Sequence, residues 1–175
     1  MDLELAVIVP TYNERENIPV LLSRITDVLS DTSWEVIVVD DNSPDGTADL
    51  VRRTSKDNPK IRCLQRIGRR GLSSACIEGM LSTHARFLAV IDADLQHDET
   101  VLQQMLEKLR QTDVELVIGV RTNIGEKDGA LSKVRTNLSR LGNLIANFSG
   151  ASNYADPMSG FFMIRRSLFE ECASQ

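Results

Sequence analysis

The sequence predicts an α/β protein with a mostly parallel central sheet flanked by helices. Short apolar runs at residues 5–9, 36–39 and 87–91 have the length of buried strands. Apolar residues at three- and four-residue steps follow the first run, as on one buried face of a helix, and the same spacing returns after residue 100. Strands that alternate with helices are typical of a parallel sheet with helices packed on it.

The first half of the chain supplies three strands and three helices. The run at residues 5–9 ends at Pro10, and the next helix would bury Ile18, Leu21, Leu22, Ile25, Val28 and Leu29. The β-branched run at 36–39 stops at two aspartates, and a helix from about Thr47 would bury Leu50 and Val51. Residues 61–64 form a weaker third strand, and residues 71–81 are expected to be helical.

The second half repeats the alternation. A strand at 87–91 ends at Asp92, and the helix after it, with Asp98 or Glu99 near its N-terminus, would bury Val101, Leu102, Met105, Leu106 and Leu109. A fifth strand is expected at 116–120, a helix with a basic face at 131–148, and a short sixth strand at 161–164. A further helix is expected to begin at Ser167.

Length and composition fit one soluble globular domain. With 42% hydrophobic and 26% charged residues, the chain is neither disordered nor fibrous. Twenty Lys and Arg against 25 Asp and Glu give a net charge of −5, which weighs against nucleic-acid binding. The longest purely apolar runs have five residues, against about 20 for a membrane-spanning helix, and Asp2 and Glu4 oppose a signal peptide. Three cysteines without metal-type spacing indicate reduced thiols.

The polar residues of interest follow the strands. Right-handed crossovers place the carboxyl ends of parallel strands on one edge of the sheet, where α/β proteins bind ligands. Residues 10–14 (PTYNE), Asp40 with Asp41, residues 92–94 (DAD) and residues 119–121 (GVR) are all expected at that edge. Their convergence carries more weight than any one motif.

Asp92 and Asp94 are the central pair. Two carboxylates one residue apart at a strand end cannot both point into a core, and Mg²⁺ or Mn²⁺ binds such oxygens together with substrate phosphates. Gln96 offers a third oxygen. The alternative is a solvated acidic turn that caps the next helix.

Two further segments suit a nucleoside. Tyr12 offers a flat face for a base, and Glu14 offers an acceptor for its amino groups. The alternative is that Asn13 caps the helix with acids in its first turn, and both interpretations can hold together. An acid at the second strand end can accept hydrogen bonds from ribose hydroxyls. Asp41 is preferred to Asp40 for this role, although strand alternation leaves the choice open. The alternative is an Asx-type turn, which would explain both aspartates without a ligand. No dinucleotide-binding or P-loop glycine motif is present.

Other groups carry weaker signals. The scattered basic residues Arg121, Lys127, Lys133, Arg135 and Arg140 are either a solvated helix face or an anion site. Residues 156–162 are either a loop shaped for substrate or a plain turn. No partner is apparent for His84 or His97, so neither is expected to act as a base.

Together, residues 10–17, 38–47, 92–97 and 156–161 resemble family 2 glycosyltransferases of the GT-A fold, the nucleotide-diphospho-sugar transferase fold. Among these, the chain is most similar to the polyprenyl-phosphate sugar transferases, a group that includes the dolichol-phosphate mannose synthases. Two departures, Thr122 in place of a common aromatic and residues 69–74 in place of a more glycine-rich stretch, leave the donor sugar and the acceptor open.

The resemblance implies roles for individual residues. The nucleoside pocket would be lined by Pro10, Tyr12, Glu14, Val39 and Asp41. The metal and diphosphate would be held by Asp92, Ala93, Asp94 and Gln96, with Asp94 and Arg121 as the catalytic residues. The phosphates, including that of a lipid acceptor, would be bound by Arg121, Arg135 and Ser139.

The resemblance also implies an activity: inverting transfer of a sugar, from GDP-mannose in preference to UDP-glucose, to a polyprenyl (dolichyl-type) phosphate at the cytoplasmic side of a membrane. Such an acceptor is already an anion and needs little deprotonation, which suits a chain without an evident base. Residues 1–175 would be a single catalytic domain of a longer protein, with any membrane contact beyond Gln175. The alternatives are a family 2 enzyme acting on a saccharide or protein, a nucleotidyltransferase, and a non-catalytic nucleotide-binding module.

Overall fold

The computed structural model describes residues 2–119 and 160–173, in which strands and helices alternate along most of the chain. The strands are β1 (Leu5–Thr11), β2 (Trp34–Asp40), β3 (Ile61–Gln65), β4 (Phe87–Val90), β5 (Leu116–Ile118) and β6 (Phe162–Arg165). The helices are α1 (Ile18–Val28), α2 (Thr47–Asp57), α3 (Leu72–Leu81), α4 (Val101–Gln111) and α6 (Arg166–Ala173).

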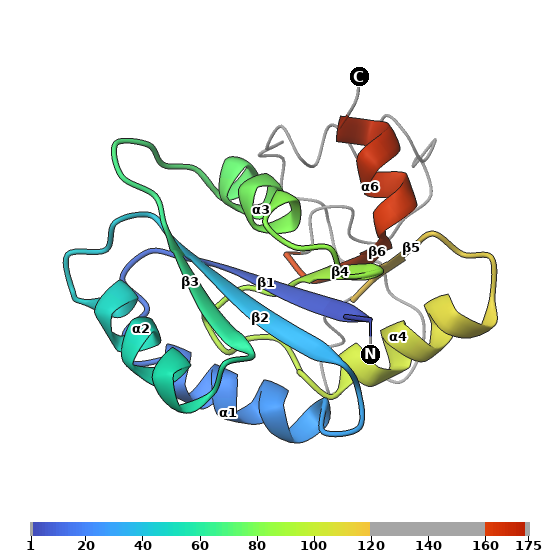
Figure 1. The fold of residues 1–175 in the computed structure, drawn as a ribbon, viewed down its shortest axis with the longest axis horizontal. Coiled ribbons are helices and arrows are strands. Elements are labelled where there is room, and N and C mark those ends of the chain that lie inside the picture. Colours follow the sequence, from blue (N-terminus) through green and yellow to red (C-terminus); the bar gives the residue numbers. More distant parts are fainter. Residues whose placement is uncertain (1, 120–159, 174–175) are drawn as a thin grey trace, which may run out of the picture.

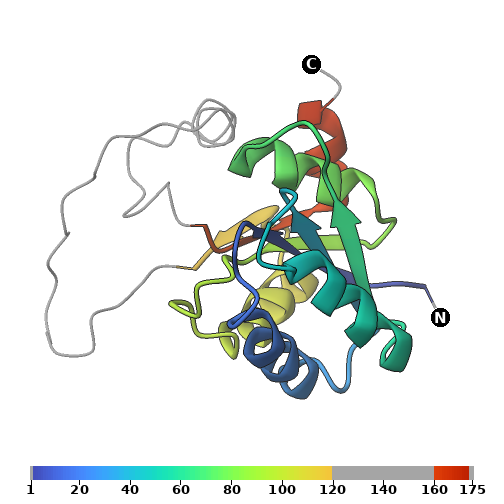
Figure 2. The same ribbon diagram turned by 90° about the vertical axis from the view of Figure 1, so that its left-hand side faces the viewer.

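The sheet has helices on both faces. In Figure 1, α1, α2 and α4 lie below it and α3 and α6 above it, and Figure 2 shows the same layers from the side. Alternate strand residues divide accordingly: Val7 and Val9 pack with α1 and α4, whereas Ala6 and Ile8 pack with α3 and α6. Because both faces are covered, β1 and β2 are buried throughout, which explains why their sequences are continuous apolar runs rather than alternating ones.

The strand order is β3-β2-β1-β4-β6-β5. The pairs β1–β2, β2–β3 and β1–β4 are parallel, whereas β6 runs antiparallel to both of its neighbours. The α/β class and the mostly parallel sheet are therefore confirmed. The order reverses between β1 and β4, since the chain first builds outward through β2 and β3 and then returns to the other side of β1.

The expected elements are present with small differences at their ends. β1 continues through Pro10 to Thr11, because Pro10 still pairs in register with Val39 of β2. β5 ends at Ile118, two residues before the expected end at residue 120. The helix expected at residues 131–148 lies outside the described residues, as does most of the loop expected at residues 156–162.

Candidate active site

The order reversal between β1 and β4 marks the edge where a ligand is expected. In open α/β sheets the crevice for a ligand lies outside the carboxyl ends of the strands, at the point where the strand order reverses. Tyr12 directly follows β1, and Asp92 lies two residues beyond the end of β4. Because β1 and β4 are parallel neighbours, the fold brings the PTYNE and DAD segments to the same edge.

Asp92 and Asp94 stand on a tight turn after β4. The backbone N–H of Gln96 donates to Oδ1 of Asp94 at 3.1 Å, and Leu95 between them adopts a left-handed conformation, with φ at 60°. Ala93 is buried in the core, whereas both aspartates remain partly exposed. The turn thus directs the carboxylates outward while the residue between them anchors the backbone.

Asp92 has a histidine beside it, which the sequence did not indicate. Nε2 of His97 lies 3.6 Å from Oδ2 of Asp92. The His97 ring is buried and packs against Phe161, with ring centroids 5.1 Å apart. The expectation that His97 has no partner is wrong, because the turn at Leu95 returns the chain toward Asp92 and Phe161 arrives from a distant segment.

The residues present fit a divalent cation that shares its shell with a substrate. Within residues 2–119 and 160–173, no group of three or more His, Cys, Asp or Glu side chains could hold a metal ion alone. Two carboxylates and the Gln96 amide match the protein share of a Mg²⁺ or Mn²⁺ site that is completed by phosphate oxygens and water.

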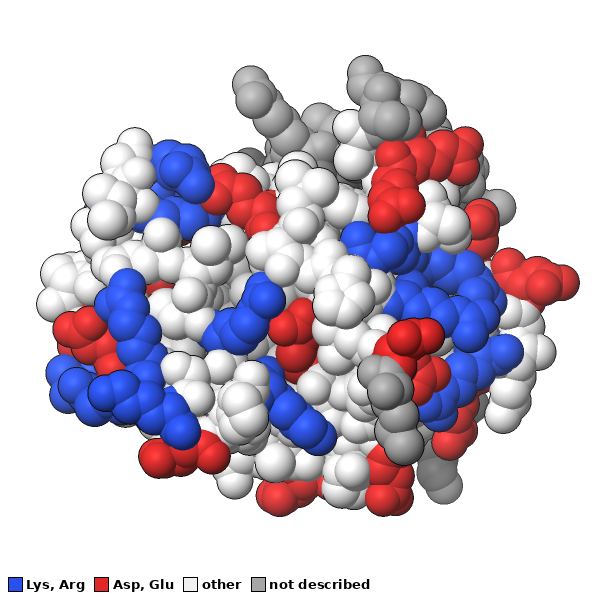
Figure 3. All heavy atoms as spheres, viewed as in Figure 1, with Lys and Arg blue, Asp and Glu red and all other residues white. Residues whose placement is uncertain are grey.

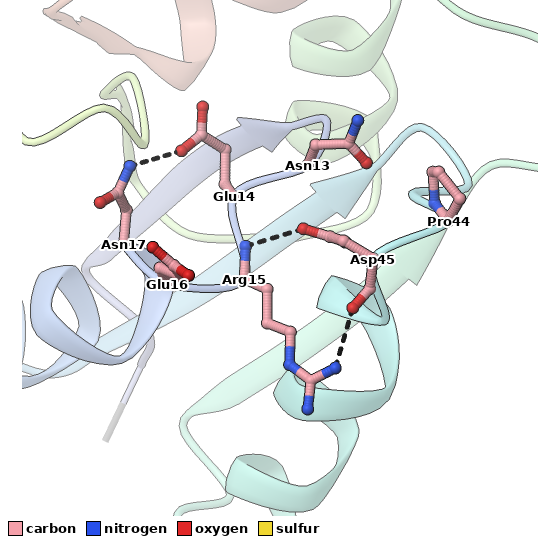
Figure 4. A pocket seen from close by; sticks show the side chains of 7 residues that line it. All are labelled: Asn13, Glu14, Arg15, Glu16, Asn17, Pro44 and Asp45. Carbon is pink, nitrogen blue, oxygen red and sulfur yellow. Dashed lines mark hydrogen bonds between the residues drawn. The ribbon is translucent and has the colours of Figure 1, made fainter.

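A pocket of about 630 Å³ opens after β1, between residues 13–17 and the segment of Pro44 and Asp45. Figure 4 shows Glu14 hydrogen-bonded to Asn17, with 2.7 Å between Oε2 and Nδ2. The backbone N–H of Arg15 donates to Asp45 Oδ2 at 3.1 Å, and the Arg15 guanidinium donates to the Asp45 carbonyl at 2.9 Å. These bonds tie the two loops together along one wall of the pocket.

The helix-cap explanation of the PTYNE segment is wrong. Helix α1 begins at Ile18, its N-cap residue is Asn17, and its first turn contains no acid. Asn13 lies four residues earlier with φ at 61°, and its backbone N–H donates to Ser43 Oγ at 2.9 Å. Glu14 is therefore not explained by the needs of the helix terminus.

The two aspartates after β2 have different surroundings. Asp40 is fully buried and accepts hydrogen bonds from the backbone N–H and hydroxyl of Ser43, so the turn explanation applies to it. Asp41 accepts a hydrogen bond from the backbone N–H of Gly71 at 2.8 Å. It also lines a second pocket, of about 350 Å³, together with Asn42 and residues 68–70. The structure thus settles which aspartate reaches a pocket, and it is Asp41.

The other residues predicted to line the nucleoside pocket are partly exposed and partly buried. Tyr12 is 43% exposed, and the guanidinium carbon of Arg70 lies 4.4 Å from its ring centroid. Pro10 and Val39 are buried and pair in register, and Val39 packs under α3. Tyr12 and Asp41 therefore offer side chains at this edge, whereas Pro10 and Val39 form the floor beneath them.

The main residue that sequence reasoning missed is Arg66. It follows β3 directly, and its side chain is completely buried against Asp41. A buried arginine is rare unless it is paired, so its place at a strand end was the available signal. Nearby, Arg69 binds Glu78 through two hydrogen bonds, and this pairing lowers the pKa of Glu78 from its usual value.

A third pocket, of about 310 Å³, lies at the opposite edge of the sheet, where β4 and β5 begin. Basic side chains gather over the α4 and β5 region, at the right of Figure 3. Among those that line the pocket, Arg110 forms a two-pronged pair with Glu4, and Arg165 donates to the carbonyls of Leu109, Thr112 and Val114. These arginines hold the end of α4 and are not free to bind a ligand.

The predicted phosphate-binding residues cannot be placed. Arg121, Arg135 and Ser139 lie outside the described residues, as do Lys127, Lys133 and Arg140. Their roles stay predictions. Among the described helices, none combines the length and the apolar character needed to cross a membrane.

Comparison with known proteins identifies the family of this chain. The sequence model of glycosyl transferase family 2 matches residues 6–173, nearly the whole chain. The chain belongs to glycosyl transferase family 2. The matched range takes in every motif on which the resemblance was based.

This family 2 chain is similar to several curated proteins. It is 34% identical over 170 residues to a dolichol-phosphate mannosyltransferase of Pyrococcus furiosus, covering 96% of this chain and 48% of the relative. It is 33% identical over 178 residues to the dolichol-phosphate mannosyltransferase of Saccharomyces cerevisiae, covering 98% and 64%. An undecaprenyl-phosphate mannosyltransferase of Micrococcus luteus is 34% identical over 162 residues, covering 91% and 65%. The chain thus spans about half to two thirds of these relatives.

Solved structures confirm the GT-A fold. Mannosyl-3-phosphoglycerate synthase from Rubrobacter xylanophilus superimposes with a TM-score of 0.71 at 18% identity, covering 95% of this chain and 55% of that one. A mannosyltransferase from Pyrobaculum calidifontis, solved with GDP-Man and Mn²⁺, gives a TM-score of 0.68 at 23% identity, covering 98% and 47%.

Proposed function

We propose that this protein is a metal-dependent, inverting glycosyltransferase that moves a mannosyl group from GDP-mannose to a polyprenyl phosphate. The observation that carries the proposal is the Asp92–Asp94 pair on the edge where the strand order reverses, the same edge at which the exposed ring of Tyr12 follows β1. The similarity to dolichol-phosphate and undecaprenyl-phosphate mannosyltransferases supports the sugar and the class of acceptor.

The nucleoside end of the donor would lie beside Tyr12, Glu14 and Asp41. The Tyr12 ring offers its face to a base, and Glu14 and Asp41 are acceptors for base amino groups and ribose hydroxyls. Asn17 holds one oxygen of Glu14, which fixes its orientation and leaves the other oxygen for a ligand. Since Arg70 already lies over Tyr12, a base would meet the guanidinium as well as the ring.

The diphosphate end would lie beside Asp92, Asp94 and Gln96. A bound Mg²⁺ or Mn²⁺ would neutralise the negative charge that develops on the departing nucleoside diphosphate. The protein contributes fixed carboxylates: Asp94 is held by the N–H of Gln96, and Asp92 is flanked by His97 and by the backbone of Gly160. Prearranged groups of this kind lower the barrier because they need not reorganise during the reaction.

The acceptor phosphate would bind to Arg121, Arg135 and Ser139. A phosphate monoester is an anion at neutral pH, so its oxygen needs no strong base before it attacks the sugar carbon. The work that remains for the protein is to align donor and acceptor and to stabilise the leaving group. We place this reaction at the cytoplasmic surface of a membrane, where a polyprenyl phosphate would present its head group.

A direct assay tests the proposal. The protein is incubated with Mn²⁺, vesicles that contain undecaprenyl or dolichyl phosphate, and labelled GDP-mannose or UDP-glucose, and the lipid product is extracted. We expect labelled polyprenyl-phosphate mannose with wild type and none with Asp94→Asn. Asp98→Asn is the matched control, because the Asp98 carboxylate binds Thr100 rather than facing the proposed metal. Label that appears only in a saccharide or protein, or no transfer at all, would contradict the proposal.

A further inference from the structure

Arg66 has a completely buried charged side chain near the donor edge, and none of the steps proposed above uses it. It begins the connection between β3 and α3, and its side chain has no exposed surface. Burying a guanidinium is unfavourable unless its charge and its N–H groups are matched by partners. Its contacts therefore indicate what the residue is for.

Those contacts join both ends of the connecting loop. Nη1 donates to the Gly71 carbonyl at 3.1 Å, and Nη2 donates to Ser74 Oγ at 2.8 Å, which fixes the start of α3. Nε lies 3.3 Å from Oδ1 of Asp41 and 3.6 Å from Oε1 of Glu78. One side chain thus connects the end of β3, the start of α3 and the aspartate after β2.

The pair with Arg66 holds the Asp41 carboxylate through one of its two oxygens. Both Arg66 Nε and Asp41 Oδ1 are buried, and neither makes a hydrogen bond within the described part of the chain, so they attract each other through charge alone. The other oxygen of Asp41 is held by the N–H of Gly71. The carboxylate is therefore held at both oxygens. Oδ1 is enclosed against Arg66, and Oδ2, which accepts one hydrogen bond from Gly71, keeps a lone pair that a hydroxyl group could use.

Glu78 is shared between two arginines, and its contact with Arg66 is the longer one, at 3.6 Å. Arg69 already binds both oxygens of Glu78, with distances of 2.8 and 2.5 Å. The tip of the loop is open: Ile67 is 72% exposed, and Gly68 has φ at 77°. Arg66 thus fixes the base of the loop, where Asp41 lies, and not its tip.

We infer that Arg66 is a positioning residue that holds the Asp41 carboxylate ready for the ribose hydroxyls of the donor. The inference rests on the proposed donor site and adds to it a residue that acts on the nucleotide only through Asp41. The 350 Å³ pocket that Asp41 lines with residues 68–70 is the space that the ribose would enter.

Calorimetric titration with Mn²⁺ tests the inference, using GDP and 2′,3′-dideoxy-GDP as probes. Wild type should bind GDP more tightly than the dideoxy analogue. Arg66→Met should weaken GDP binding by roughly tenfold and bring the two affinities close together, because a misplaced carboxylate no longer recognises the hydroxyls. Arg66→Lys, which keeps the charge, should recover part of the preference. Arg62→Met is the matched control, because Arg62 lies in β3, just before Arg66 in the chain, and pairs with Glu35 at 3.2 Å, away from the pocket.

The outcomes are distinct. If wild type does not bind GDP, the proposed donor site fails and the inference fails with it. If wild type prefers GDP and Arg66→Met keeps the same preference, the inference alone is wrong. If Arg66→Met does not fold, Arg66→Lys gives the answer, with its melting temperature measured beside its preference. Failure of both variants to fold would show that Arg66 holds the whole structure, which contradicts a role specific to Asp41.

Discussion

The backbone of Gly160 lies directly against the carboxylate of Asp92. An added Cβ at Gly160 would lie 2.0 Å from Oδ2 and 2.6 Å from Cγ of Asp92, far inside van der Waals contact. Only a residue without a side chain leaves Asp92 where it stands. The close approach connects Gly160, which lies 68 residues further along the chain, to the proposed metal site.

Gly160→Ala should therefore displace Asp92 and weaken metal-dependent nucleotide binding. Mutation of a residue that supports a metal ligand typically lowers metal affinity by roughly 10- to 100-fold. Titration of Mn²⁺ in the presence of GDP measures the loss, and the melting temperature without metal shows whether the fold is kept. Equal Mn²⁺ affinity in both proteins would mean that Asp92 tolerates the shift or does not bind the metal.

Gly79 also allows a close approach of the backbone, here between helix α3 and the sheet within the core. A Cβ there would lie 2.6 Å from Ile8 Cγ2 and 2.9 Å from Val39 Cγ2, so helix α3 can approach the sheet only through a glycine. Gly79→Ala should lower the free energy of unfolding by about 1–3 kcal/mol, as overpacking does. Urea unfolding measures this, with Leu81→Ala, at a 63% exposed site on the same helix, as the control. A Gly79→Ala protein as stable as wild type would show that α3 is not packed this closely.

The buried thiols should be unreactive in the folded protein. Burial raises the pKa of Cys76 from 9.0 to about 12 and that of Cys63 to about 11. The fold thus favours the neutral thiols, a stabilisation that is complete below pH 9 and declines as pH rises above it, because the unfolded thiols ionise first. Reaction with Ellman's reagent at pH 8 should leave Cys76 unmodified until denaturant is added. Rapid labelling of Cys76 in the native protein would contradict its burial between α3, to which it belongs, and the sheet.

Arg135 is predicted to bind the acceptor phosphate. A charge-assisted hydrogen bond contributes about 1.5–3 kcal/mol, so Arg135→Ala should reduce transfer to polyprenyl phosphate roughly ten- to a hundredfold. Donor binding should be largely kept, which titration with GDP and Mn²⁺ would show. Kinetics with polyprenyl phosphate equal to those of wild type would mean that Arg135 is an ordinary surface charge.

Much of the fold was predictable because β1, β2 and β4 are buried on both faces. A continuous apolar run between breakers, as before Asp41 and Asp92, shows where such a strand lies without any knowledge of its partners. The antiparallel direction of β6 was not predictable in this way, since its pairing depends on how the chain returns between residues 119 and 160. The sequence therefore predicted the class of the sheet but not the direction of its last strand.

The residues of the candidate site also differ in whether local sequence predicts their position. Tyr12, Asp41, Asp92 and Asp94 all lie within four residues after the end of a strand, so the alternation of elements was enough to gather them at one edge. Arg66 beside Asp41, and His97 beside Asp92, depend on backbone turns and on contacts between distant segments. No local pattern reports such contacts, because they form only when the loops pack against each other.

The central claim is that Asp92 and Asp94 hold a divalent cation that bridges to a nucleotide at the edge between β1 and β4. A crystal grown with GDP and Mn²⁺ tests it most directly, since anomalous scattering locates manganese independently of the rest of the density. The account predicts an anomalous peak about 2.0–2.2 Å from oxygens of Asp92 and Asp94, the range for small hard divalent cations, with the diphosphate beside it and the base near Tyr12. A peak elsewhere, or a base on the opposite edge of the sheet, would contradict it.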